Sequence, residues 1–97
     1  MPPEDDETAA LLVRTVDERY DDLVALIDAR LKTGWRFERL ILADRLILLL
    51  GAAELLASER GSGAVAGWTH LADLYGEPNS AGFINGVLAG IMRSRGD

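Results

Sequence analysis

The segment Leu40–Leu56 constrains the fold of this chain more than any other feature. Charged residues interrupt it only at Asp44, Arg45 and Glu54, so apolar side chains would cover several sides of a helix. A helix that is apolar all round is usually buried among other elements. We therefore predict an all-α fold around a central helix that spans residues 36–58.

An apolar stripe at helical spacing predicts one long helix before the central one. The stripe consists of Leu12, Val16, Tyr20, Leu23, Ile27 and Leu31. We expect this helix to begin near Asp6. Gly34 is placed to end it, because glycine readily adopts the left-handed conformation that commonly follows a helix.

Two shorter helices are predicted after the central one. The first covers Ala64–Leu74, and the last begins at a cap provided by the side chain of Asn79 or Ser80. No alternating pattern typical of strands persists anywhere. The sequence thus predicts an antiparallel bundle of about four helices over residues 8–97, preceded by an acidic tail at residues 1–7.

The net charge of this chain limits how it can bind a nucleic acid. The formal net charge is −6, so the chain as a whole does not attract phosphates. Basic residues nevertheless cluster around one predicted turn, at Arg30, Lys32, Arg36 and Arg39. Any contact with RNA therefore has to come from a local patch.

No residue pattern points to catalysis, to a metal or to a cofactor. His70 is the only histidine and lacks a partner at metal-ligand spacing, so we expect a structural or surface role. The chain has no cysteine, which excludes disulfides and thiolate metal sites and fits a reducing cytoplasm. The longest apolar run, residues 46–53, is far too short to span a membrane. We predict a cytoplasmic protein that is not an enzyme.

Asn85 and Gly86 stand together inside an apolar helical pattern formed by Phe83, Val87 and Ile91. Both residues lower helix propensity, so tertiary structure has to favour them there. We expect Gly86 to allow another backbone to approach closely. We expect Asn85 to be buried and hydrogen-bonded, because buried polar groups need partners.

Two motifs resemble the NusB family of bacterial transcription antitermination factors. The first has its fixed positions at Ser80, Phe83, Asn85, Gly86 and Leu88. The second lies upstream, in residues 35–40, 44–48 and 54–56. The resemblance covers residues 10–92 and corresponds to the second half of a family protein. Family members begin with an Arg-rich helix, whereas this chain has an acidic run at residues 4–7.

The resemblance implies a NusB-like bundle that binds boxA-type RNA together with NusE, a ribosomal small-subunit protein, during transcription of ribosomal RNA. The start of the last helix would face RNA through Asn79, Ser80 and Phe83. Lys32 and Arg36 would approach RNA from the predicted turn. A structural interpretation competes with this one, since Asn79 and Ser80 are good helix caps and Phe83 fits a core.

The resemblance also places Asp44 and Arg45 on the surface that holds NusE. The competing interpretation is that both form ion pairs across the bundle, with residues such as Arg39 or Asp17. Glu54 is predicted to be structural, because a carboxylate in so apolar a run must be paired or hydrogen-bonded.

Two alternatives to the RNA-binding function follow from the departures from the family pattern. The chain could be a protein–protein interaction module that has lost RNA binding, since Ala81 and Gly82 stand where basic residues are common. It could instead be a structural remnant or a fragment of a longer chain. We also expect a homodimer or an obligate partner, on the ground that part of the stripe through Leu12, Leu23 and Leu26 would be exposed.

Overall fold

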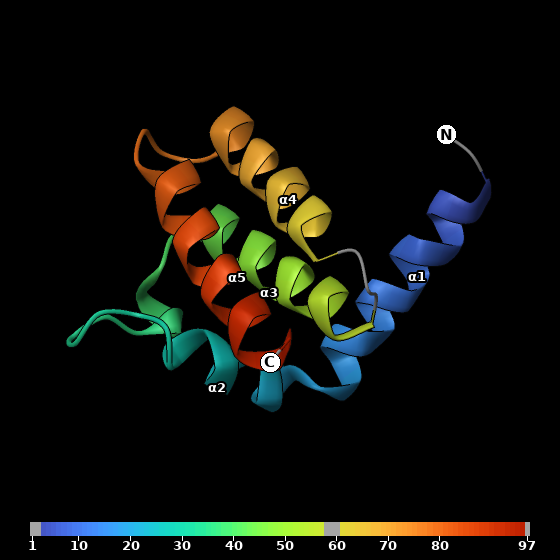
Figure 1. Cartoon of the computed structure of the whole chain (residues 1–97), viewed down its shortest axis with the longest axis horizontal. Helices are drawn as coiled ribbons and strands as arrows, with labels where there is room; N and C mark the ends of the chain where they lie inside the picture. Colours follow the sequence, from blue (N-terminus) through green and yellow to red (C-terminus); the bar gives the residue numbers. More distant parts are fainter. Residues whose placement is uncertain (1–2, 58–60, 97) are drawn as a thin grey trace.

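The computed structural model describes residues 3–57 and 61–96, which form an all-α bundle without strands in those ranges (Figure 1). Its elements are α1 (Pro3–Glu18), α2 (Tyr20–Asp28), the 3-10 turn η1 (Phe37–Arg39), α3 (Leu42–Ala57), α4 (Ser62–Tyr75) and α5 (Ser80–Gly96). The predicted fold class is confirmed. No helix in the described ranges has both the length and the apolar character that crossing a membrane requires.

Helix α3 is the centre of the bundle, as its sequence predicts. It packs against α1, α2, α4 and α5, and it is buried over most of its length. Helix α4 runs back along α3, and α5 then returns in the opposite direction (Figure 1). The face of α5 that packs inward carries Ile84, Leu88 and Ile91, all of which are almost completely buried. Burying each such side chain stabilises the fold by about 1.5–3 kcal/mol.

The stretch predicted as one helix from Asp6 to Leu31 is two helices, and this prediction is wrong. Helix α1 begins at Pro3, within the predicted acidic tail, and the helical path breaks at Arg19, where φ is −123° and ψ is 26°. Both α1 and α2, on either side of this break, pack against α3. An apolar stripe can continue through such a turn, so periodicity did not reveal it.

The apolar stripe that we expected to be exposed is covered by the chain itself. Leu12 and Leu23 are buried, and Leu26 is partly buried against the core. The reason for expecting a homodimer therefore fails.

The central helix starts later than predicted, at Leu42 rather than Arg36. Arg36 and Leu40 both have extended backbone on either side of η1. The buried side chains of Phe37 and Leu40 both join the core from this short segment. Gly34 does have positive φ, at 93°, but it lies in the loop after α2 instead of closing a helix. The predicted end at Ser58 lies outside the described residues.

Asn85 and Gly86 lie on the exposed side of α5, so the predictions that Asn85 is buried and that Gly86 lets another backbone approach closely are wrong. A Cβ atom added to Gly86 would meet nothing within 4 Å. The Asn85 side-chain amide donates a hydrogen bond of 3.4 Å to the Thr69 hydroxyl at an exposed position. The apolar pattern around them belongs to the neighbouring, inward face of the same helix.

Close approach between elements instead depends on Gly51 and Gly76. A Cβ at Gly51 would lie 2.8 Å from Leu88 Cδ1, where α3 meets α5. A Cβ at Gly76 would lie 2.6 Å from Ser80 Cβ and 2.8 Å from the Ala72 carbonyl oxygen. The Gly76 contact involves backbone, so glycine is required there, whereas a side chain at Gly51 would force the Leu88 side chain to shift.

The start of α5 uses the predicted residues in a different way. The Asn79 carbonyl accepts the first helical hydrogen bond, from the Phe83 N–H at 3.2 Å, so Asn79 occupies the cap position through its backbone. The Ser80 hydroxyl accepts from the Glu77 N–H at 3.0 Å, which fastens the preceding turn and not the helix. The predicted side-chain cap is therefore replaced by a hydrogen bond within the turn.

Glu54 has the structural role that the sequence predicts. The residue is buried on α3, and its Oε1 accepts a hydrogen bond of 2.7 Å from the Trp68 indole nitrogen on α4. A charged acceptor makes this bond stronger than one between neutral groups, because the interior screens it poorly.

Replacing Trp68 by Phe should lower the free energy of unfolding by roughly 1.5–3 kcal/mol, because the ring remains while the bond to a charged acceptor is lost. Urea denaturation followed by circular dichroism measures this change. Trp35→Phe is the matched control, because the Trp35 side chain is 58% exposed and should tolerate the change. Equal stability of the two variants would contradict the role given to Glu54.

Candidate functional site

A groove of about 680 Å³ lies between the segment that joins α2 to α3 and the first half of α5. Its size falls within the range of ligand-binding pockets. It is lined by Arg30, Lys32, Trp35, Arg39, Leu40, Ile41, Asp44, Glu77, Asn79, Ser80, Gly82, Phe83, Gly86 and Val87. We call this feature the α5 groove.

The α5 groove brings together most of the residues predicted to contact RNA. Lys32 lines it from the loop after α2, while Asn79, Ser80 and Phe83 line it from the start of α5. These residues are far apart in sequence, so their meeting depends on the fold. Arg36 does not line the groove and instead borders two smaller hollows beside the same loop.

The groove concentrates positive charge on an otherwise acidic chain. Arg30, Lys32 and Arg39 contribute cations, against the carboxylates of Asp44 and Glu77. Arg30 is held in place because its aliphatic stem lies against α5 (a Cβ at Gly90 would be 3.1 Å from Arg30 Cδ). The local excess of cations is what an anionic ligand needs from a chain whose net charge is −6.

Two positions on the α5 side of the groove carry no side chain. Gly82 and Gly86 are one helical turn apart, both line the groove, and a Cβ added to either would meet nothing within 4 Å. The exposed indole of Trp35 and the half-buried ring of Phe83 also line it. The groove thus combines open helix backbone with two aromatic rings.

Asp44 lies in the groove, whereas its neighbour Arg45 lies outside it. Asp44 is only 8% exposed, and its Oδ1 is buried without a hydrogen-bond partner in the described part of the chain. The Arg45 Nε is likewise buried and unpartnered there. Neither residue forms an ion pair within residues 3–57 and 61–96, so the interpretation that they pair across the bundle is wrong.

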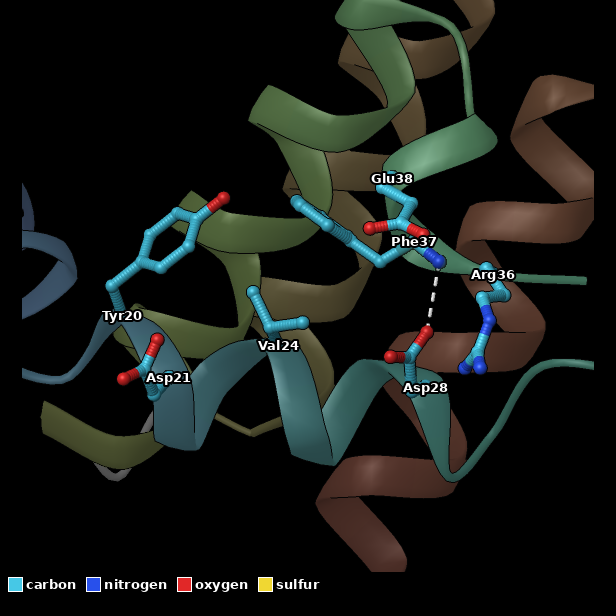
Figure 2. A pocket seen from close by; sticks show the side chains of 7 residues that line it. All are labelled: Tyr20, Asp21, Val24, Asp28, Arg36, Phe37 and Glu38. Carbon is cyan, nitrogen blue, oxygen red and sulfur yellow. Dashed lines mark hydrogen bonds between the residues drawn. The ribbon is translucent and has the colours of Figure 1, made fainter.

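The loop that carries Lys32 and Trp35 is fastened by Asp28. Its Oδ1 accepts a hydrogen bond of 2.8 Å from the Phe37 backbone N–H (Figure 2). The buried Phe37 ring meets Tyr20 edge-on, with ring centroids 6.4 Å apart. These contacts fix both ends of the loop, and therefore fix one wall of the α5 groove.

Sequence reasoning missed Trp35, Gly82 and Gly86 as groove residues. Trp35 belongs to the upstream motif, and its high exposure in the structure is not visible from that pattern. An exposed aromatic residue next to clustered basic residues was the available signal. The predicted surface role of His70 agrees with its exposed position on α4. No cluster of possible metal ligands occurs among the residues that the structure describes.

Comparison with known proteins identifies the family. The family model described as "NusB family" matches residues 1–93. The chain belongs to the NusB family. The NusB match begins at residue 1, so it is broader than the range 10–92 expected from the motifs, and it includes both walls of the α5 groove.

Two relatives named "Transcription antitermination protein NusB" show how far the similarity extends. The chain is 34% identical over 97 residues to NusB of Lacticaseibacillus casei, covering 95% of this chain and 72% of that protein. It is 36% identical over 95 residues to NusB of Symbiobacterium thermophilum, covering 96% of this chain and 61% of that protein. The match therefore exceeds the half of a family protein that the motifs indicated.

Replacing Asp28 by Ala should lower the free energy of unfolding by roughly 1–3 kcal/mol, because the part-buried Phe37 N–H loses its acceptor. It should also speed hydrogen exchange at that amide, as one end of the loop is released. Asp28→Asn keeps an acceptor oxygen and should have a smaller effect. Asp21→Ala, at an exposed position of the same helix, is the control. Unchanged exchange in Asp28→Ala would show that the bond does not hold the loop.

Proposed function

We propose that this NusB-family protein acts in transcription antitermination by binding boxA-type RNA together with NusE during transcription of ribosomal RNA. The observation that carries this proposal is the convergence of Lys32, Asn79 and Phe83 in one cation-rich groove. The named relatives are antitermination proteins, which supports the same function.

The α5 groove has the components that single-stranded RNA binding requires. Backbone phosphates would be attracted by Arg30, Lys32 and Arg39, which line it and are exposed. Unpaired bases stack on aromatic side chains, and Trp35 and Phe83 supply two rings. Because the chain is acidic overall, affinity has to come from these local contacts and from a partner.

A separate surface on α3 supports contact with the protein partner. Leu42 and Leu46 lie one turn apart and are 61% and 49% exposed, and Arg45 lies beside them on the helix. We call this feature the α3 strip. Exposed apolar residues next to an arginine are typical of protein interfaces. The α3 strip retains the predicted role of Arg45 toward NusE, whereas the buried Asp44 offers little surface to a protein.

The alternative function is a protein interaction module that keeps the α3 strip but does not bind RNA. The net charge of −6 and the small residues Ala81 and Gly82 ahead of Phe83 favour it. The two functions differ in one measurable property, which is salt-sensitive RNA binding.

Labelled boxA RNA titrated with the protein at several salt concentrations should bind, with tighter binding when NusE is present. Three contacting cations give a slope of log K against log salt of roughly −2 for single strands. Lys32→Gln should reduce that slope by roughly 0.7, whereas Arg14→Gln, at an exposed position of α1 that does not line the groove, should leave it unchanged. Absence of RNA binding at low salt, with NusE present and bound, would contradict the proposal and favour the alternative.

Replacing Leu46 by Glu should weaken NusE binding by tenfold or more, as one interface anchor is typically worth about 1–2 kcal/mol. The substitution places a charge on exposed surface, so the folded state should persist. Leu74→Glu is a matched control, because Leu74 is 57% exposed on α4. Calorimetric titration with NusE compares the variants, and equal weakening by both would remove the α3 strip from the interface.

A further inference from the structure

We propose that Gly90 is a positioning residue for Arg30, and that Arg30, lying over it, is the fixed point at which the α5 groove holds a phosphate of the RNA backbone. The inference rests on the proposed function, because it specifies how one cation of the groove is held ready for its ligand. It adds to the interface a residue of α5 that does not itself line the groove.

The first support is the contact between Arg30 and α5. A Cβ atom added to Gly90 would lie 3.1 Å from Arg30 Cδ and 3.6 Å from both its Nε and its Nη1. The Arg30 side chain therefore lies across the helix at Gly90, from Cδ to the guanidinium group. Gly90 is buried, although Gly86, one helical turn before it, is exposed.

The second support is that core packing does not call for glycine at residue 90. The three atoms nearest to the added Cβ all belong to Arg30, and neither backbone nor a core side chain is among them. At Gly51, by contrast, the nearest atoms belong to Leu88 and Trp68. Glycine lowers helix stability relative to alanine, so its presence in α5 has a cost. The contact with Arg30 is the feature of the structure that this cost accompanies.

The third support is the state of the Arg30 guanidinium group. Arg30 lines the groove and is exposed, and its side chain forms no ion pair or hydrogen bond among the described residues. Packing on α5 therefore orders a cation whose donors are not used within the described part of the protein. A planar guanidinium group can donate two hydrogen bonds to one phosphate. An arginine that is already ordered loses less side-chain entropy when it binds.

The other groove residues favour an RNA strand as the ligand of Arg30. Lys32 and Arg39 add two exposed cations, and Trp35 and Phe83 add two aromatic rings. A single strand carries phosphates and unpaired bases in alternation, so it can contact the cations and the rings at once. Arg30 would then fix one phosphate, while the neighbouring bases stack.

The order of the Arg30 side chain can be measured in the free protein, by NMR relaxation of the arginine Nε–H groups. The Nε–H of Arg30 should be more ordered than that of Arg14, which is exposed on α1 and forms no ion pair among the described residues. Gly90→Leu places a side chain where Arg30 lies, so it should lower the order of Arg30 to the level of Arg14. Equal mobility of the two arginines in the natural protein would overturn the inference without any RNA present.

Titration with labelled boxA RNA, with NusE present, tests the consequence for binding. Arg30→Gln should weaken RNA binding roughly fivefold at about 0.1 M salt and reduce the slope of log K against log salt by roughly 0.7, as expected for one lost phosphate contact. Gly90→Leu should weaken binding to a similar extent in the natural protein. It should have no further effect in the Arg30→Gln variant, because its effect passes through Arg30.

Two further variants control for folding and for the substitution itself. Gly67→Leu is the matched control, since Gly67 is exposed on α4, does not line the groove and has nothing within 4 Å of an added Cβ. It should leave RNA binding unchanged. Gly90→Ala needs only a small shift of Arg30, so it should cause a smaller loss than Gly90→Leu, and it provides the test if the leucine variant does not fold. Thermal melting followed by circular dichroism checks the folded state of each variant.

Unchanged RNA binding in a folded Gly90→Leu variant, or an equal loss with and without Arg30, would overturn the inference and leave the proposed function intact. Loss of NusE binding in Gly90→Leu, with RNA binding retained, would show that Arg30 serves a protein ligand and would also overturn it. No binding of boxA RNA by the natural protein, with NusE bound, would overturn the proposed function together with the inference.

Discussion

The burial of α3 among the other helices is the constraint on which the rest of the structure depends. It commits one face of α5, with Ile84, Leu88 and Ile91, to the core. The opposite side of α5 is then left to carry Gly82 and Gly86 at the surface. The groove that we assign to RNA is thus a consequence of how α5 must pack on α3.

The central helix could be predicted because a run as long and apolar as Leu40–Leu56 has to be buried among other elements. The breaks at Arg19 and before Leu42 could not be predicted in the same way, since the apolar pattern continues through them. They arise from tertiary contacts, such as the bond from the Phe37 N–H to Asp28. The apolar pattern of the sequence indicates which helix faces are apolar. It does not indicate where the chain must turn to bury those faces.

The candidate site was predicted in part. Lys32, Asn79 and Phe83 could be named from the family resemblance, and the fold brings them together in the α5 groove. The position of Asp44 in that groove could not be read from its neighbours, because the path of the loop between α2 and α3 decides it. The motif containing Gly86 indicated the family correctly, although the reason given for that glycine was wrong. In the structure, Gly86 leaves an open position on the surface of α5.

The most direct test of the account is an amide chemical-shift titration of the protein with boxA RNA. Glycine amides resonate in a distinct region, so Gly82 and Gly86 can be compared with Gly67 in one spectrum. The account predicts that the signals of Gly82, Gly86 and the Trp35 indole shift as RNA is added, while that of Gly67 does not. Shifts confined to other surfaces, with Gly82 and Gly86 unchanged, would contradict it.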